Sequence, residues 1–147
     1  MPRNSRRNLM LEYRVEAHRI DAHGSEVRCK DARLIIDTDL AGRRDALNPA
    51  ELLLAAVAAC ILKNIERVAP ILHFEFERVK IQVHGVRQDS PPKMQQVDYR
   101  IEIDTTESDQ RLALLHKNVQ KYGTIYNTVS AGTRLEGVLV RMAEPTP

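Results

Sequence analysis

The chain has 147 residues, the length of one ordinary domain, and 43% of them are hydrophobic, which is enough to form a core. Its 22 basic and 20 acidic side chains give a net charge of +2, without the large basic excess of a nucleic-acid-binding domain. Aromatic residues make up only 4% of the chain, so we expect a core of aliphatic side chains.

The longest uninterrupted apolar run covers residues 52–62, whereas a membrane-spanning helix needs about twenty such residues. The basic residues near the N-terminus are not followed by an apolar stretch of signal-peptide length. The 2 Cys do not form the framework of a disulfide-rich secreted protein. We therefore expect a single domain over residues 1–147, located in the cytoplasm with reduced thiols, with no membrane contact and no nucleic-acid partner.

Three short strands are predicted in the N-terminal third, because apolar and polar residues alternate over residues 9–18, 26–30 and 33–37. Residues 21–25 contain a Gly and read as the hairpin turn between the first two strands. Residues 40–47 form a loop that carries Arg43 and Arg44.

The helix that follows this loop has the clearest start signal in the sequence. Asn48 suits the N-cap, Pro49 the first helical position, and Glu51 the third position, where it caps the helix in return. We predict a helix over residues 49–69, ended by Pro70. Because it is apolar on all sides from residue 52 to 62, it must be covered on every side, and we expect a homodimer to cover it.

The C-terminal half predicts an antiparallel hairpin, with strands at 79–84 and 97–104 and a turn at 88–94. A helix over 108–122 should stop at Gly123, and a short helix over 125–131 and a strand over 134–142 should follow. Helices that are separate from antiparallel strand pairs are typical of the α+β class. The His residues lack metal-site spacing and the Cys residues lack a CxxC partner, so we expect neither a metal nor a cofactor.

Cys60 is the strongest candidate for chemistry, although a Cys in an apolar helix is usually a packing residue. It lies about three turns from the helix start, too far for the helix dipole to activate it. A reactive thiolate there needs a nearby cation. Lys63 and Arg67 follow Cys60 on roughly the same helix face, and Arg43 and Arg44 are candidates from the preceding loop.

Residues 48–60, with the sequence NPAELLLAAVAAC, resemble the signature of the OsmC/Ohr family, the osmotically inducible protein C and organic hydroperoxide resistance proteins. Residues 121–129 resemble the family's second motif, and the predicted order of elements agrees over nearly the whole chain. The resemblance implies an intertwined dimer in which antiparallel sheets wrap a pair of long central helices. It also implies that a first Cys attacks an organic hydroperoxide at the dimer interface, that a second Cys resolves the sulfenic acid to a disulfide, and that an external dithiol reduces it.

The sequence departs from this family pattern at three positions. Gly123 stands where the resolving Cys is expected, and Ala50 stands where the catalytic Glu is expected, with Glu51 directly after it. The Arg of the family's turn between the first two strands has no match in residues 21–25. The resemblance therefore implies a divergent member of the family with a single reactive thiol.

Two functions follow from the sequence. In the first, the protein is a one-Cys thiol peroxidase for small hydrophobic peroxides, with Cys60 and Glu51 as catalytic residues and an external thiol as reductant. Its candidate binding residues are Arg43, Arg44, Lys63, Tyr122 and Tyr126. In the alternative, the protein is a non-catalytic dimeric binding module, which holds a small apolar ligand at the subunit interface while Cys60 serves packing alone.

Overall fold

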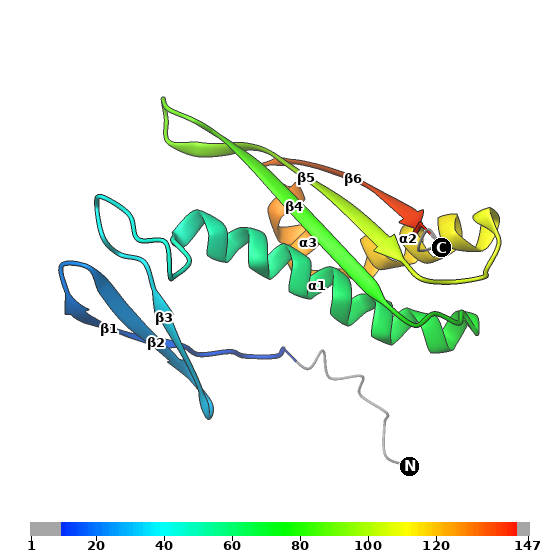
Figure 1. Ribbon diagram of the computed structural model, residues 1–147, viewed down its shortest axis with the longest axis horizontal. Coiled ribbons are helices and arrows are strands. Elements are labelled where there is room, and N and C mark those ends of the chain that lie inside the picture. Colours follow the sequence, from blue (N-terminus) through cyan, green and yellow to red (C-terminus); the bar gives the residue numbers. More distant parts are fainter. Residues whose placement is uncertain (1–9, 144–147) are drawn as a thin grey trace, which may run out of the picture. The chain divides into compact units, whose positions relative to one another are not determined.

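The computed structural model describes residues 10–143. Its elements, in chain order, are β1 (Glu16–Asp21), β2 (Gly24–Cys29), β3 (Ala32–Ile36), α1 (Pro49–Leu72), β4 (Val79–Gln88), β5 (Lys93–Ile103), α2 (Asp109–Tyr122), α3 (Thr124–Ser130) and β6 (Arg134–Arg141) (Figure 1). They form two compact units, one before and one after the Pro49–Ala50 bond. The predicted α+β class is confirmed, and the expectation of a single domain stays a prediction.

The N-terminal unit contains an antiparallel sheet in the order β1-β2-β3. Its register places Ala17 opposite Val27, and Val27 opposite Leu34, so these apolar residues share one face. The strand predicted over residues 9–18 is wrong in its first part, because residues 10–15 form no strand and residue 9 lies outside the described residues. Alternating apolar and polar residues indicate an extended chain with one face to be buried, and residues 10–15 show this pattern. However, β2 pairs only with residues 16–21, so the earlier residues have no partner strand within residues 10–143.

The loop after β3 is organised by the carboxylate of Asp37, which is 5% exposed. This carboxylate accepts hydrogen bonds from the backbone N–H of Asp39, at 3.0 Å, and of Arg43, at 3.0 Å. The Arg43 guanidinium in turn donates to both carboxylate oxygens of Asp45, at 2.6 and 2.8 Å. Side-chain bonds to the backbone thus order a loop that has no regular structure of its own.

Helix α1 begins at Pro49, as predicted, but continues through Pro70 to Leu72. It ends in a Schellman motif, in which the N–H of Phe74 bonds to the carbonyl of Ala69 and the N–H of His73 bonds to the carbonyl of Pro70. His73 takes the left-handed conformation, with φ of 51°. A Gly usually fills this position, so its absence from the sequence hid the true end of the helix.

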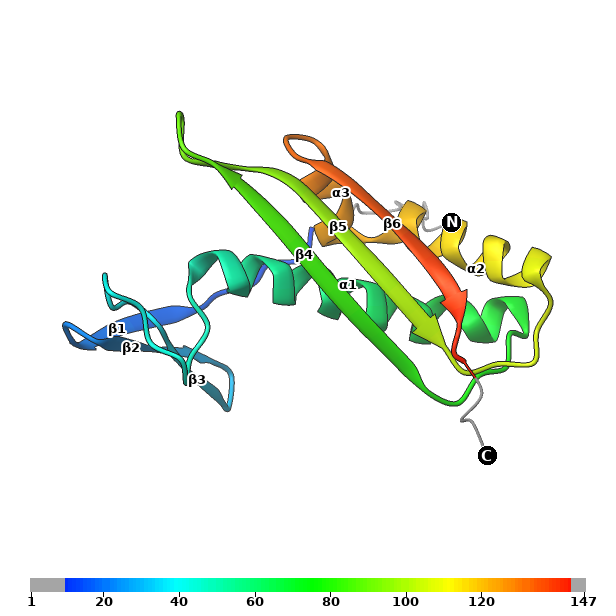
Figure 2. The same ribbon diagram turned by 45° about the horizontal axis from the view of Figure 1, so that its top comes forward.

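The second unit is a sheet in the order β4-β5-β6, with α1, α2 and α3 on one face (Figure 2). β4 and β5 form the predicted antiparallel hairpin, whereas β6 pairs in parallel with β5. The parallel pairing arises because α2 and α3 carry the chain back along the sheet before β6 begins. Ser108 caps α2 by accepting a hydrogen bond from the N–H of Arg111, and α2 ends at Tyr122, next to Gly123, as predicted.

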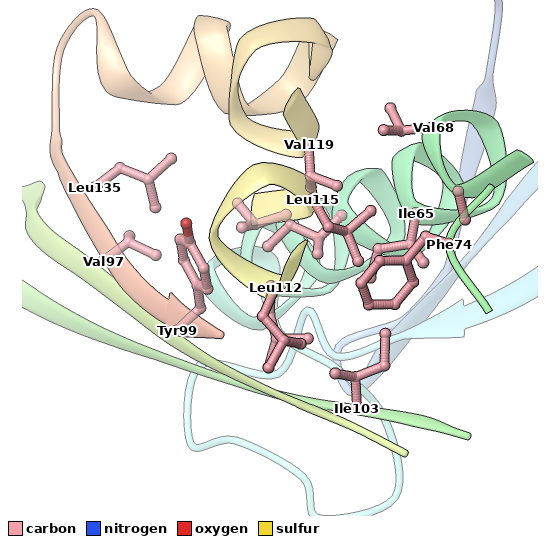
Figure 3. Packing of buried hydrophobic residues seen from close by; sticks show 14 residues of the cluster. Ile65, Val68, Phe74, Val97, Tyr99, Ile103, Leu112, Leu115, Val119 and Leu135 are labelled. Atoms are coloured by element: carbon pink, nitrogen blue, oxygen red, sulfur yellow. The ribbon is translucent and has the colours of Figure 1, made fainter. Parts of the chain in front are cut away.

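The core of this unit lies between the helices and the inner face of the sheet (Figure 3). Its fully buried members come from α1, β5 and α2: Val57, Ile61, Ile65, Val97, Ile101, Ile103 and Leu115. The expected aliphatic core is confirmed, with Phe74 and Tyr99 added. Only one face of α1 is buried here, because Leu62 is 42% exposed and Ile71 is 72% exposed on the same helix. Within residues 10–143, no helix is both long and apolar enough to span a bilayer.

A polar cluster penetrates this core at Tyr99. Its hydroxyl lies 2.7 Å from Nε2 of His116 and accepts a hydrogen bond of 2.8 Å from the amide of Gln120. The ring crosses Gly137 on β6, where a Cβ would collide with the ring atoms. Burial raises the pKa of Tyr99 to about 12, and burial lowers the pKa of His116 below its ordinary value.

We predict that Tyr99 contributes to unfolding at alkaline pH. Its ordinary pKa is 10.0 and its folded value is about 12, so between these values the unfolded chain releases a proton that the folded chain keeps. The free energy of unfolding, measured with urea, should therefore fall as the pH rises through this window. In Tyr99→Phe that part of the fall should be absent, while stability at neutral pH drops by about 1–3 kcal/mol because Gln120 and His116 lose a partner.

The matched control is Tyr122→Phe, because Tyr122 is 52% exposed and lies outside the buried polar cluster. This variant should keep both the stability and the pH slope of the unchanged protein. An identical alkaline slope in Tyr99→Phe and the unchanged protein would contradict the prediction.

Candidate functional site

The sulfur of Cys60 lies near the middle of α1, half-buried, where the junction between α2 and α3 crosses the helix. Two neighbours define its surroundings. The side-chain amide of Asn64 donates a hydrogen bond to Sγ at 3.4 Å. Gly123 lies on the other side, and a Cβ added to it would stand 3.1 Å from Sγ and 3.2 Å from Nδ2 of Asn64. The sequence brings Cys60 and Gly123 together, as the resemblance implied.

The local geometry of α1 explains why Asn64 reaches the sulfur. Residues four apart on a helix are neighbours on one face, and side chains lean toward the helix N-terminus. The amide of Asn64 therefore points back to Cys60, one turn earlier. Gly123 connects α2 to α3 with φ of −80°, a conformation open to any residue. A Gly is therefore favoured here because a side chain would crowd the sulfur, and not because the backbone conformation excludes other residues.

Asn64 is itself held by a third residue. It is only 3% exposed, and its carbonyl oxygen accepts a hydrogen bond of 3.0 Å from the guanidinium of Arg67. Arginine can only donate, so the amide oxygen must face Arg67 and the amide nitrogen must face the sulfur. A positive charge is thereby linked to the thiol through one oriented amide.

Tyr126 and Tyr122, both expected to line a pocket, have different surroundings. The Cβ of Tyr126 would lie 2.9 Å from a Cβ at Gly123, and its ring stands edge-on to Tyr99 with centroids 6.4 Å apart. It therefore borders the site and connects it to the polar cluster in the core. Tyr122 is exposed and lies under the ammonium of Lys121, which is 5.3 Å from the ring centroid.

Among the described hydrogen bonds of α1, Lys63 and Glu51 make none with Cys60. Lys63 is exposed on the helix surface. Glu51 is nine positions before Cys60, which on a continuous helix means about 13 Å along the axis and the opposite side. Glu51 therefore does not reach the thiol of its own copy. The roles predicted for Lys63 and Glu51, and for Arg43 and Arg44 in the N-terminal unit, stay predictions.

Asn64 is the residue that sequence reasoning missed. The signal was visible, because a polar side chain inside an apolar helix, four positions after the only Cys of that helix, needs a partner. The other thiol, Cys29 on β2, is half-buried, and neither Cys is in a disulfide. In the described part of the chain, no group of three or more His, Cys, Asp or Glu side chains is arranged to hold a metal ion.

The family of OsmC-like proteins matches this chain over residues 42–136. The structure is similar to that of an OsmC-like protein from Mycoplasma pneumoniae, with a TM-score of 0.82, 17% identity and coverage of 90% of this chain and 99% of that one. It is also similar to the organic hydroperoxide resistance protein OsmC of Legionella pneumophila (TM-score 0.65, 20% identity, 91% and 98% covered). The organic hydroperoxide resistance protein OhrB of Bacillus subtilis is a third similar structure (TM-score 0.62, 18% identity, 88% and 98% covered). No curated protein matches the chain by sequence.

The position of Gly123 predicts that a disulfide to Cys60 can be created by Gly123→Cys. In a disulfide, each Cβ lies about 3 Å from the sulfur of the other residue, and a Cβ at position 123 would stand 3.1 Å from Sγ. Gly123→Cys should therefore lose its reactive Cys60 thiol under air and regain it with a reductant, as measured by thiol titration and intact mass. In contrast, Gly123→Ala should lose about 1–3 kcal/mol of stability, because its methyl group crowds the sulfur without bonding to it.

The matched controls are Gly132→Cys and Gly132→Ala, because a Cβ at Gly132 would meet nothing within 4 Å. The first should keep its added thiol free, and the second should unfold at the same urea concentration as the unchanged protein. The proposed geometry is wrong if Gly123→Cys keeps all its thiols free while Gly123→Ala is fully stable.

Proposed function

Because this chain belongs to the family of OsmC-like proteins, we propose that it reduces organic hydroperoxides through the single thiol of Cys60. Two of the similar structures are organic hydroperoxide resistance proteins, which supports this class of substrate. The observation that carries the proposal is the surroundings of the sulfur. A hydrogen-bond donor stands 3.4 Å from Sγ on one side, and Gly123 packs against the sulfur on the other side without a side chain to cover it. Cys60 is only half-buried, so a reactant can approach it from solvent.

The first half of the proposed cycle is an attack of the Cys60 thiolate on the outer oxygen of a hydroperoxide. A sulfur–oxygen bond forms and the oxygen–oxygen bond breaks, with its electron pair leaving on the alkoxide oxygen, which takes up a proton to give the alcohol. The sulfur is oxidised by two electrons to a sulfenic acid, and the peroxide is reduced by two.

The second half uses an external thiol reductant, here written as a dithiol, which meets the sulfenic acid directly because position 123 offers no second thiol. One sulfur of the dithiol attacks the sulfenic sulfur and releases water, which leaves a mixed disulfide with Cys60. The second sulfur of the dithiol then displaces the Cys60 thiolate and closes a disulfide within the reductant. A reducing thiol pool of this kind is typical of the cytoplasm, which we propose as the location.

We predict that the purified protein consumes cumene hydroperoxide in the presence of a dithiol reductant, and that Cys60→Ser abolishes this consumption. A serine hydroxyl cannot pass through the sulfenic state, so the loss should be complete and not partial. Peroxide consumption is followed over time, and the oxidised sulfur is captured by a dimedone probe.

Cys29→Ser is the matched control, since it removes the other thiol of the chain and should keep the activity. If Cys60→Ser consumes hydroperoxide as fast as the unchanged protein, the thiol mechanism is refuted. The non-catalytic dimer with an apolar ligand at its interface is then the function to test, by identifying what copurifies with it.

We further propose that the protein acts as a homodimer. In the N-terminal unit the chain leading into β1 carries alternating apolar residues, and Leu11, Tyr13 and Val15 are 76%, 80% and 69% exposed. Leu34 shares the apolar face of the sheet and is 43% exposed. A single copy rarely leaves so much apolar surface in water, and a second copy would cover it.

We predict that Leu34→Glu weakens this dimer, whereas Ile35→Glu does not. The two side chains are almost equally exposed, at 43% and 40%, but successive residues of β3 point to opposite faces of the sheet. Only the face of Leu34 carries the apolar row with Ala17 and Val27. Light scattering should give twice the chain mass for the unchanged protein and for Ile35→Glu, and a lower mass for Leu34→Glu. A monomeric unchanged protein would refute the dimer.

A further inference from the structure

The sulfur of Cys60 has lost the usual means of stabilising a thiolate that its family resemblance implies. Ala50 cannot act as a carboxylate, and the turn at residues 21–25 carries no Arg. A thiol removed from water becomes less reactive unless a donor or a cation favours the charged form. The described contacts of Cys60 therefore have to supply that support from other residues.

The amide of Asn64 is the donor that the structure places on the sulfur. Its nitrogen is 3.4 Å from Sγ, within the range of a hydrogen bond to sulfur, and the residue is 3% exposed. A donor buried beside the sulfur favours the thiolate over the thiol, since the charged form accepts the stronger hydrogen bond. Low local polarity strengthens this preference.

Arg67 fixes the direction of that donor. Its guanidinium bonds to the amide oxygen of Asn64 at 3.0 Å, so the amide cannot rotate its oxygen toward the sulfur without losing this bond. The charge also polarises the amide, which makes its N–H a better donor. Arg67 thus acts on the sulfur through the side chain of Asn64, while Arg67 itself stays exposed to water.

The elements packed against the thiol add few other groups that carry or change charge. From α1 these are Asn64, which is neutral, and Arg67 behind it. From the junction of α2 and α3, Gly123 contributes only its backbone. Tyr126, whose Cβ lies beside Gly123, contributes a half-buried phenol. Among the described contacts, Arg67 is the cation that is connected to the sulfur.

We propose that Asn64, held by Arg67, is the positioning residue of Cys60: its N–H stabilises the thiolate and holds the sulfur against the backbone of Gly123. A positioning role for the peroxide reaction rests on the proposed function, but the effect on the thiol itself does not. In place of the Glu and the Arg that the resemblance implies, the chain thereby supports the thiol with a pair of residues that follow it on α1.

The test measures the rate of Cys60 alkylation by iodoacetamide against pH, in a Cys29→Ser background so that Cys60 is the only thiol. Asn64→Leu should move the midpoint of this profile upward by about one pH unit, which at neutral pH is roughly a tenfold slower reaction. At a pH above both midpoints the rates should converge, because the thiol is then ionised in both proteins. A merely structural role would not give this convergence.

A second variant protects the test if Asn64→Leu does not fold, since Asn64 is buried. Arg67 is exposed, so Arg67→Gln should fold and should shift the midpoint in the same direction by a smaller amount. Arg67→Lys keeps a donor and a charge and should retain most of the original profile. Lys117→Gln removes the same charge from an exposed side chain of α2 and should shift nothing.

Three outcomes separate this inference from the proposed function. Unchanged midpoints in both Asn64→Leu and Arg67→Gln overturn the inference, whatever the peroxide activity. A larger shift in Lys63→Gln than in Arg67→Gln also overturns it, because the exposed Lys63 would then be the activating cation. Shifted midpoints in a protein that consumes no hydroperoxide support the inference and refute the proposed function.

Discussion

The packing of one face of α1 against the β4-β5-β6 sheet determines most of what happens at Cys60. Val57, Ile61 and Ile65 are buried at helical spacing, and this row fixes the rotation of the helix about its axis. Each residue turns the helix by about 100°, so Cys60, just before Ile61, must lie at the flank of the buried row. There it is half-buried and faces the junction of α2 and α3. A helix rotated by one residue would place the sulfur either in the core or in water.

The elements that the sequence predicts correctly are those whose signals are local. The start of α1 at Pro49 was predicted from capping residues within one turn, and the end of α2 was predicted from Gly123; both agree with the structure. The extension of α1 beyond Pro70 was missed because its Schellman end uses His73 in place of a Gly. The strand over residues 9–18 failed in part for a different reason. The alternation of apolar and polar residues indicates which side chains are suited to burial, but not whether this chain supplies the strand that pairs with them.

The parallel pairing of β6 with β5 also lay beyond local patterns. Apolar and polar residues alternate in the same way in both directions of a strand, so the pattern predicts a strand without its orientation. The direction is decided by the path of the intervening chain, in which α2 and α3 return along the sheet.

Some features of the candidate site were likewise predicted from the sequence, and one was missed. Its thiol was predicted from the spacing between Asn48-Pro49 and Cys60, and the approach of Gly123 was implied by a family motif more than sixty residues later. The contact between Asn64 and the sulfur was missed although it is local, because a buried Asn satisfies its hydrogen bonds in many ways. Only the bond from Arg67 decides which end of the amide faces Cys60. An arginine seven positions after a cysteine indicates a shared helix face, not a connection through a third side chain.

The bare backbone at Gly123 also has an evolutionary consequence. A single nucleotide change can turn a glycine codon into a cysteine codon, and the same change run backward removes the cysteine. Because the sulfur of Cys60 already lies at disulfide distance from that position, a chain with one thiol and a chain with two are neighbours in sequence space. Under the proposed cycle, one substitution in a lineage would thus decide whether the outside reductant meets a sulfenic acid or a disulfide.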